Sequence, residues 1–223
     1  MNPKSTRNKS NRKSDQDQRI ANRLGAINQI LLLFMNDLSA MQRLKEHGYP
    51  DLSEGFLLQD QAMGTFTARQ IAMAAQGEAT TAVIEAQRAV RVAYGDFRKI
   101  GRVVFKDDIT RAALGLTGRI PVERARLIHL ARTGFETAQK PDYAPALARR
   151  GLTAAVFEAN LALLAALVAA DEAQVAAMAA ARQATANRTT AMARLDAWFG
   201  EFRGIAKVAF RQQPEWVSAL KIR

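Results

Sequence analysis

The thirteen residues YGDFRKIGRVVFK at 94–106 recur as FGEFRGIAKVAFR at 199–211, a displacement of 105 residues. Six of the thirteen positions are identical, and four more keep an aromatic ring or the sign of a charge. The same register continues upstream without a gap and places Met73 on Met178. Matched glycines, phenylalanines and basic residues arise by chance less readily than matched alanines, so the two blocks indicate an internal duplication.

Apolar residues in and before each block follow the heptad spacing of packed helices, in which side chains three and four positions apart form one seam. The first seam contains Val83, Ala86, Val90, Ala93, Phe97, Ile100 and Val104, and the second contains Ala191, Leu195, Trp198, Phe202, Ile205 and Ala209. Arg188 interrupts the second seam at the position that matches Val83. The pattern predicts coiled-coil-like packing of long helices.

Working outward from these blocks, helix signals predict a short and a long helix in each half, because β-type alternation of polar and apolar residues is rare along the chain. Expected helices cover about 19–46, 51–107, 122–139 and 154–212, and glycines and prolines separate them. We therefore expect an all-α fold, an elongated four-helix bundle made of two tandem long helical hairpins with pseudo-twofold symmetry. The expected parts are a disordered basic tail (1–18), hairpin repeat 1 (19–116), a linker (117–121) and hairpin repeat 2 (122–223).

Composition limits the class of protein. The chain has 223 residues, no cysteine, 48% hydrophobic residues and a formal charge of +11, which favours anionic partners. The absence of cysteine excludes disulfides and thiolate chemistry and fits the cytoplasm, where we place the protein. Residues 1–18 have no apolar stretch of a secretory signal, and the longest strongly apolar run, Leu161–Ala170, is about half of the ~20 residues that span a bilayer. No transmembrane segment is expected.

Two basic rows with i, i+4 spacing are the candidate anion-binding residues, since a duplicated row of cations could hold phosphate groups. The rows are Arg98, Arg102 and Lys106 in the first half and Arg203, Lys207 and Arg211 in the second. The alternative is a solvated outer face, and the heptad positions of these residues favour that interpretation.

Four phenylalanines are the candidate packing or interaction residues. Phe97 and Phe202 lie on the seams, whereas Phe105 and Phe210 occupy outer positions. We expect the chain itself to cover the outer pair, with Leu114 and Leu116 over Phe105, and Leu220 and Ile222 over Phe210. The alternative is a contact with a partner protein.

Known catalytic and ligand-binding patterns do not occur in the sequence. His47 and His129 have no second histidine or carboxylate at ligand spacing, and the Glu-x-x-His pairs of di-iron bundles are missing. Phosphate-binding loops and nucleophile or zinc motifs are missing too. We expect no cofactor, no metal and no enzymatic activity.

The second block with its continuation resembles the C-terminal end of an uncharacterised family of duplicated bacterial helical proteins. The matching residues are Phe202, Arg203, Ile205 to Arg211, Pro214 and Ala219 to Ile222. Ala113 to Leu116 are similar to the midpoint of the same family, and the resemblance covers 48–222. The family has no assigned activity, so the resemblance implies no catalytic residue.

The leading functional hypothesis is a non-enzymatic structural or protein-interaction helical bundle that binds a protein partner or forms a homo-oligomer. The alternative is binding of nucleic acid or an anionic surface through the basic tail and the two basic rows. A pocket enzyme has no positive support in the sequence.

Overall fold

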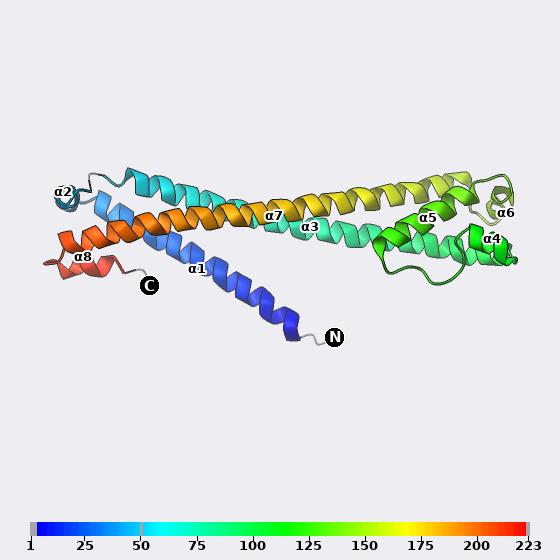
Figure 1. The fold of residues 1–223 in the computed structure, drawn as a ribbon, viewed down its shortest axis with the longest axis horizontal. Helices are drawn as coiled ribbons and strands as arrows, with labels where there is room; N and C mark the ends of the chain where they lie inside the picture. Colours follow the sequence, from blue (N-terminus) through cyan, green and yellow to red (C-terminus); the bar gives the residue numbers. More distant parts are fainter. Residues whose placement is uncertain (1–3, 50, 222–223) are drawn as a thin grey trace. The chain divides into compact units, whose positions relative to one another are not determined.

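A computed structural model describes residues 4–49 and 51–221, with side chains from Asp15 onward. The described residues form eight α-helices and no strand, which confirms the predicted all-α fold (Figure 1). The helices are α1 (Lys4–Met35), α2 (Leu38–Glu46), α3 (Ser53–Val104), α4 (Asp108–Ala113), α5 (Arg124–Ala138), α6 (Ala144–Ala148), α7 (Ala154–Ala209) and α8 (Pro214–Ala219).

Two compact units make up the chain. The terminal unit contains Met1–Ile71 and Arg182–Arg223, and the central unit contains Ala72–Ala181. The long helices α3 and α7 each contribute one part to each unit. The units therefore cut across the two predicted hairpin repeats, since each unit takes residues from both halves of the duplicated sequence.

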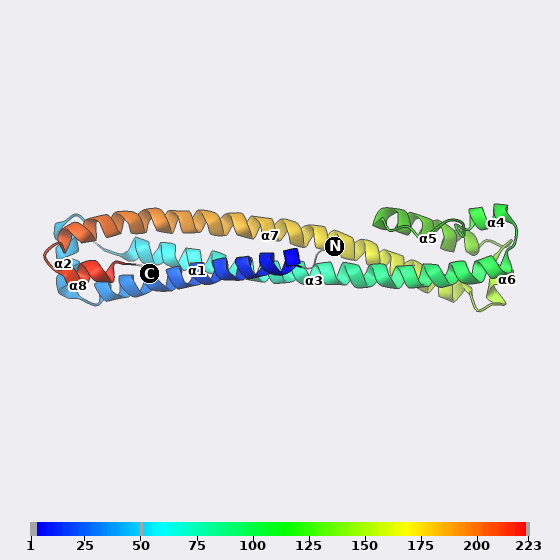
Figure 2. The same cartoon turned by 90° about the horizontal axis from the view of Figure 1, so that it is seen from below.

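In the terminal unit the first predicted helix, 19–46, is wrong as a single element, because the chain bends by 93° between α1 and α2. Asp37 causes the break: its carboxylate accepts hydrogen bonds from the backbone N–H groups of Ser39 and Ala40, both at 2.9 Å, and thereby caps α2. The bend brings α2 to the same end of the unit as α8 (Figures 1 and 2). Leu44 of α2 is fully buried in this position.

The predicted disordered tail, 1–18, is wrong from Lys4 onward, where α1 begins, and residues 1–3 lie outside the described residues. The stretch from Lys4 to Gln18 contains neither proline nor glycine, so helix started by the apolar turns of α1 can propagate through it. Of this stretch, Asp17 also forms ion pairs with two arginines. A polar composition alone was therefore a poor predictor of disorder.

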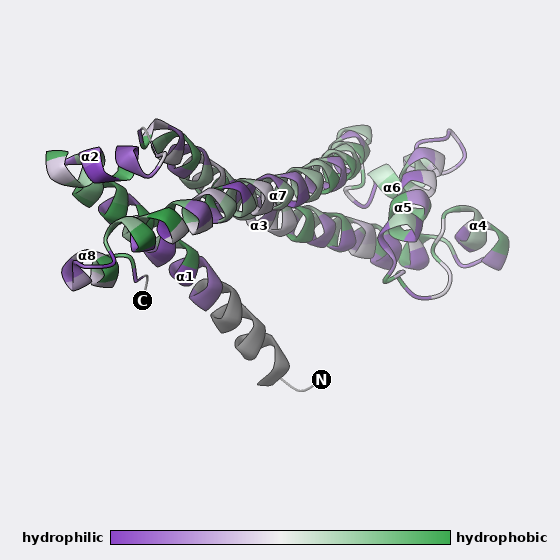
Figure 3. Ribbon diagram, turned by 60° about the vertical axis from the view of Figure 1, so that its left-hand side comes forward, coloured by the Kyte–Doolittle hydropathy of each residue, from purple (hydrophilic) through white to green (hydrophobic). Residues whose placement is uncertain are grey.

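The core of the terminal unit is aromatic. Phe34, Phe202 and Phe210 are at most 1% exposed, and Phe34 meets the two other rings edge-on at centroid distances of 5.3 and 5.4 Å. Trp216 of α8 covers Phe210 at 5.2 Å, and Leu220 is fully buried in the same core, whereas the predicted cover Ile222 lies outside the described residues. Hydrophobic and hydrophilic residues both occur along each of these helices, as amphipathic packing requires (Figure 3).

The core of the central unit forms around Phe97 and Tyr94 of α3, which are fully buried against Phe135 of α5 and Phe157 of α7. In this unit α3 and α7 run antiparallel, and α4 and α6 lie together at one end (Figures 1 and 2). Phe105 is half-buried at that end, where it meets Tyr143 at 5.7 Å. The predicted covers of Phe105, Leu114 and Leu116, are buried in the same core.

One described helix, α7, is long and apolar enough to cross a membrane, and its most apolar 18-residue window is 17% buried. The bent pair Asp15–Met35 and Leu38–Glu46 would also qualify if it formed one span. Long core helices of water-soluble proteins pass the same test of length and composition. The absence of a transmembrane segment and the cytoplasmic location therefore stay predictions.

Candidate anion-binding site

Arg98 of the first basic row is not on a solvated face, whereas Arg102 and Lys106 are exposed as the favoured interpretation expects. Arg98 is 4% exposed, and its Nη2 donates to the carbonyl oxygens of Leu116, Thr117 and Gly118 at 3.1, 2.9 and 2.7 Å. Arg102 Nε donates to the Leu116 carbonyl at 2.7 Å. Arg102 Nη2 donates to the Gly118 carbonyl at 3.1 Å. Both guanidinium groups thus bind the backbone of residues 116–118, and the buried Arg98 is not free for a ligand.

The remaining members of the rows differ among themselves. Lys106, Lys207 and Arg211 are exposed, as a solvated face requires, and the described residues show no ion pair for any of them. Arg203 is half-buried, and its Nε is buried without a hydrogen-bond partner. The Nε of Arg98 also lacks a partner, but the Nη2 of Arg98 already has three acceptors. Because a buried N–H group without a partner is costly, Arg203 is a row member that calls for an acceptor.

Arg203 lies in a groove between α1 and α7 of the terminal unit. One hollow of about 470 Å³ is lined by Arg19, Asn22, Arg23, Asp196, Phe199, Gly200 and Arg203. A second hollow, of about 430 Å³, shares Arg19, Arg23 and Asp196 with the first and is also lined by Arg188. We call this surface, with Arg19, Arg23, Arg188 and Arg203, the arginine groove.

The charge of the arginine groove is strongly positive. Four guanidinium groups face one lining carboxylate, Asp196, which pairs with Arg23 at 2.8 Å. All four cations are arginines, whose planar forks match the oxygen atoms of phosphate groups better than lysine does. The groove can therefore hold phosphates by charge and geometry, but it offers no exposed aromatic ring on which bases could stack.

Arg188 also belongs to a buried charge cluster with Arg69 and Asp17. Arg69 Nη1 lies 2.9 Å from both carboxylate oxygens of Asp17, and Arg188 Nη1 lies 3.2 Å from Oδ1. Burial lowers the pKa of Arg188, the nearby Arg69 lowers it further, and Asp17 raises it. Two cations thus share one carboxylate, which leaves the cluster with a net positive charge.

Sequence reasoning found Arg203 but missed the other three arginines of the groove. Arg19 and Arg23 lie on the polar side of α1, which no motif distinguishes from an ordinary solvated face. Arg188 did leave a signal, because it interrupts the second seam where the first seam has Val83. Such a charge on an apolar seam needs a partner, and that partner, Asp17, lay in the stretch that we predicted to be disordered.

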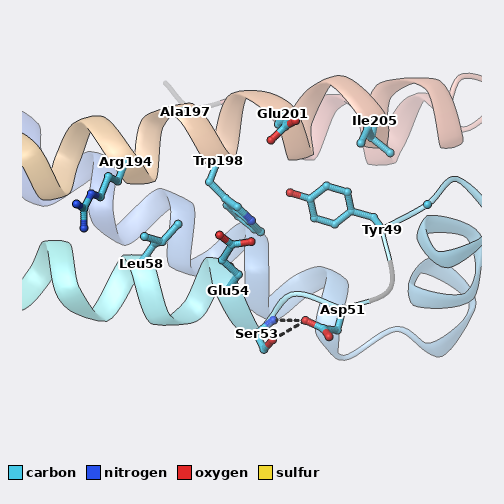
Figure 4. A pocket seen from close by; sticks show the side chains of 11 residues that line it. Tyr49, Asp51, Ser53, Glu54, Leu58, Arg194, Ala197, Trp198, Glu201 and Ile205 are labelled. Atoms are coloured by element: carbon cyan, nitrogen blue, oxygen red, sulfur yellow. Dashed lines mark hydrogen bonds between the residues drawn. The ribbon is translucent and has the colours of Figure 1, made fainter.

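A larger hollow of the terminal unit, of about 1130 Å³, has the opposite character (Figure 4). Its lining carries the carboxylates of Asp51, Glu54 and Glu201 against one cation, Arg194. The side chains of Tyr49 and Trp198 reach into the space near Glu54 and Glu201 (Figure 4). An anionic ligand would be repelled here, so size alone does not identify the anion site.

Tyr49 in this hollow gives a pH prediction. Burial, together with the negative charges of Glu201 and Glu54, raises the pKa of Tyr49 to about 12. Because the unfolded hydroxyl ionises near 10, the neutral tyrosine stabilises the fold below pH 10, and this stabilisation is lost as pH rises from 10 towards 12. Urea denaturation at pH 9 and pH 11 should show a loss for the wild type that is smaller for Tyr49→Phe. Equal losses in the two proteins would contradict this assignment.

The described part of the chain contains no group of three or more His, Cys, Asp or Glu residues placed to hold a metal ion.

The fold and the groove define an all-α helical bundle with a basic surface groove. No protein-family model, curated protein or solved structure matches the chain. The resemblance to a family of duplicated bacterial helical proteins therefore stays a prediction.

Proposed function

We propose that this protein is a non-enzymatic helical interaction protein and that its partner is nucleic acid, whose backbone phosphates lie along the arginine groove. The observation that carries the proposal is the gathering of Arg19, Arg23, Arg188 and Arg203 around connected hollows with a single lining carboxylate. The formal charge of +11 adds long-range attraction for the same partner.

The groove favours recognition of the backbone over recognition of bases. Phe199 lines the groove but is 4% exposed, so it has no free face for stacking. Arginines that meet phosphates give affinity without sequence information. We therefore expect binding that is independent of sequence and sensitive to salt, because each neutralised phosphate releases counterions.

A triple substitution tests the groove. Arg19→Gln, Arg23→Gln and Arg203→Gln together should weaken binding of a labelled oligonucleotide about tenfold or more at low salt and lower the salt slope by about 2–3, because three phosphate contacts are lost. Fluorescence anisotropy at 50 mM to 300 mM salt measures both quantities for DNA and RNA of random sequence.

The matched control is Lys106→Gln, Lys207→Gln and Arg211→Gln, which removes the same formal charge from exposed positions outside the groove. This control should lose much less affinity than the groove variant. Equal losses in the two triple variants, with both folded by circular dichroism, would contradict a localised site. Binding to phosphatidylserine vesicles but to neither nucleic acid would assign the groove to membranes and overturn the proposal.

Self-assembly is a second candidate, favoured by exposed apolar side chains on α3 of the central unit. Ile84 and Val92 are 62% and 59% exposed, and with Ile120 they line a hollow of about 420 Å³. Exposed apolar surface of this kind is typical of interaction faces. Light scattering over a range of concentrations tests this candidate, and a strict monomer would remove it.

A further inference from the structure

The cluster of Asp17, Arg69 and Arg188 in the terminal unit has the construction of an anion-binding site. The arginine side chains are 11% and 9% exposed, and both point a terminal nitrogen at the Asp17 carboxylate. The carboxylate itself is 26% exposed, so solvent reaches the occupant while the two cations stay buried. The two buried guanidinium groups thus hold the Asp17 carboxylate, a small anion, at the solvent-exposed side of the cluster.

The charges of this cluster do not balance. Asp17 neutralises one of the two cations, and the Nε of Arg69 is buried without a hydrogen-bond partner. Uncompensated buried charge is costly, so an anion with more charge and more acceptor oxygens than a carboxylate would satisfy the pair better. A phosphate monoester or inorganic phosphate has that chemistry.

Packing alone does not explain the two arginines. The displacement of 105 residues matches Arg188 of the second half with Val83 of the first, and Arg69 of the first half with Gln174 of the second. Both neutral counterparts belong to the central unit. In the central unit Val83 is buried at 1% exposure, which shows that the seam accepts an apolar side chain there. The pair of arginines is therefore a feature of the terminal unit that the helical packing does not require.

The cluster opens towards the arginine groove. Arg188 lines the groove, and Gln16 and Arg19, which flank Asp17 on α1, line the same hollow. Ile20 lies next in α1 and packs against the core of the terminal unit. Movement of Asp17 would therefore involve the turn of α1 before Ile20 and leave the buried part of the helix in place.

We propose that Arg69 and Arg188 form an oxyanion-binding site, that Asp17 is its internal occupant, and that an external phosphate group displaces Asp17 and loosens the adjoining turn of α1. The site then extends the arginine groove by one buried pair of cations. This inference rests on the proposed function only if the phosphate is part of a nucleic acid. A free phosphate has the same chemistry, and its binding would not depend on that function. Asp17 competes intramolecularly, so external phosphate must displace a carboxylate that the chain itself holds in place.

Inorganic phosphate is the probe, with chloride at equal ionic strength as the reference. Asp17→Asn removes the occupant's charge and should bind phosphate at least about tenfold more tightly than the wild type, which corresponds to ~1.4 kcal/mol. Asp15→Asn, an exposed neighbour on α1, is the matched control and should behave as the wild type. Isothermal titration gives the affinities, and the melting temperature of Asp17→Asn should rise more steeply with phosphate than with chloride.

Arg188→Val shows whether binding occurs at the proposed cations, since valine is the residue that the first seam has at this position. In the Asp17→Asn background it should abolish the phosphate response while circular dichroism still shows the helical fold. In the wild type, phosphate should speed hydrogen exchange of residues 15–19 but not of the helix beyond Ile20. This last measurement needs no variant, so it remains decisive if Asp17→Asn fails to fold.

Failure of this inference and failure of the proposed function give different results. If folded Asp17→Asn shows no preference for phosphate over chloride, or if Arg188→Val leaves the response intact, the oxyanion site is wrong, whatever the groove variants do. If phosphate binds as expected while no oligonucleotide binds the wild type, the site stands as a receptor for a free oxyanion and the nucleic-acid proposal is wrong.

Discussion

Replacement of Gly55 by alanine is expected to lower the free energy of unfolding by about 1–3 kcal/mol, because the added methyl group would overlap the indole of Trp198. A Cβ atom at Gly55 would lie 2.1 Å from Cη2 and 2.5 Å from Cζ3 of Trp198. The indole can move away only by giving up its stacking on Phe202, whose ring plane lies at 4° to its own, and its contact with the ring of Tyr49 at 5.9 Å. Either α3 or the aromatic core must shift.

The matched control is Gly64→Ala on the same helix, where an added Cβ would meet no atom within 4 Å. Alanine should stabilise the helix at that position by up to ~1 kcal/mol, because glycine in a helix interior has the greater conformational entropy to lose. Urea denaturation followed by tryptophan fluorescence measures both variants. Two shifts in the same direction would show that the contact between Gly55 and Trp198 does not limit packing.

Helix positions could be predicted well wherever strong start and stop signals coincide with an apolar pattern. The fourth helix was expected over about 154–212 and runs over Ala154–Ala209, and the third was expected to end near Gln139 and ends at Ala138. Glycine and proline set these ends, and their effects are local. Local physics of this kind is readable from one sequence.

The break between α1 and α2 was missed because the apolar stripe continues across it. Periodicity cannot distinguish one straight helix from two helices that share a core, since both place the same residues inside. Asp37 was the available signal, as a capping residue followed at two positions by a serine whose hydroxyl also donates to it at 2.6 Å. The fold class was predictable here, and the direction of the chain was not.

The candidate site was harder to predict than the fold, because helical periodicity assigns a face to a residue but does not say what lies on that face. Arg98 and Arg203 match in the duplicated block, yet Arg98 binds linker carbonyls and Arg203 lies in the arginine groove. The difference arises from long-range packing, since the linker folds back on α3 in the central unit and α1 lies beside α7 in the terminal unit. Repeated sequence thus predicted repeated packing but not repeated use of the charges.

Removal of the Arg98 guanidinium group is the second large effect that we expect. Arg98→Met keeps the apolar stem of the side chain and deletes the donors that serve three consecutive carbonyl oxygens of the linker. Arg102 still donates to the carbonyl oxygens of Leu116 and Gly118, so only the Thr117 carbonyl loses its one side-chain donor. The loss of these charged hydrogen bonds should cost about 1–3 kcal/mol in the free energy of unfolding, because water can reach the exposed Thr117 and Gly118. Arg98→Lys should recover only part of the loss, since one ammonium group cannot reproduce the spread of the fork.

Lys99→Met is the control for Arg98→Met, because it removes one cation from the next position of the same helix. The Lys99 side chain is 80% exposed and pairs only with Asp96 on its own helix, so its loss should change the free energy of unfolding by less than ~0.5 kcal/mol. Urea denaturation compares the two variants, and hydrogen exchange of residues 114–118 should speed up in Arg98→Met alone. If both methionine variants unfold at the same urea concentration, the linker holds its conformation without Arg98. The turn would then depend on the left-handed backbone of Gly115 and Gly118, whose φ angles are 66° and 67°.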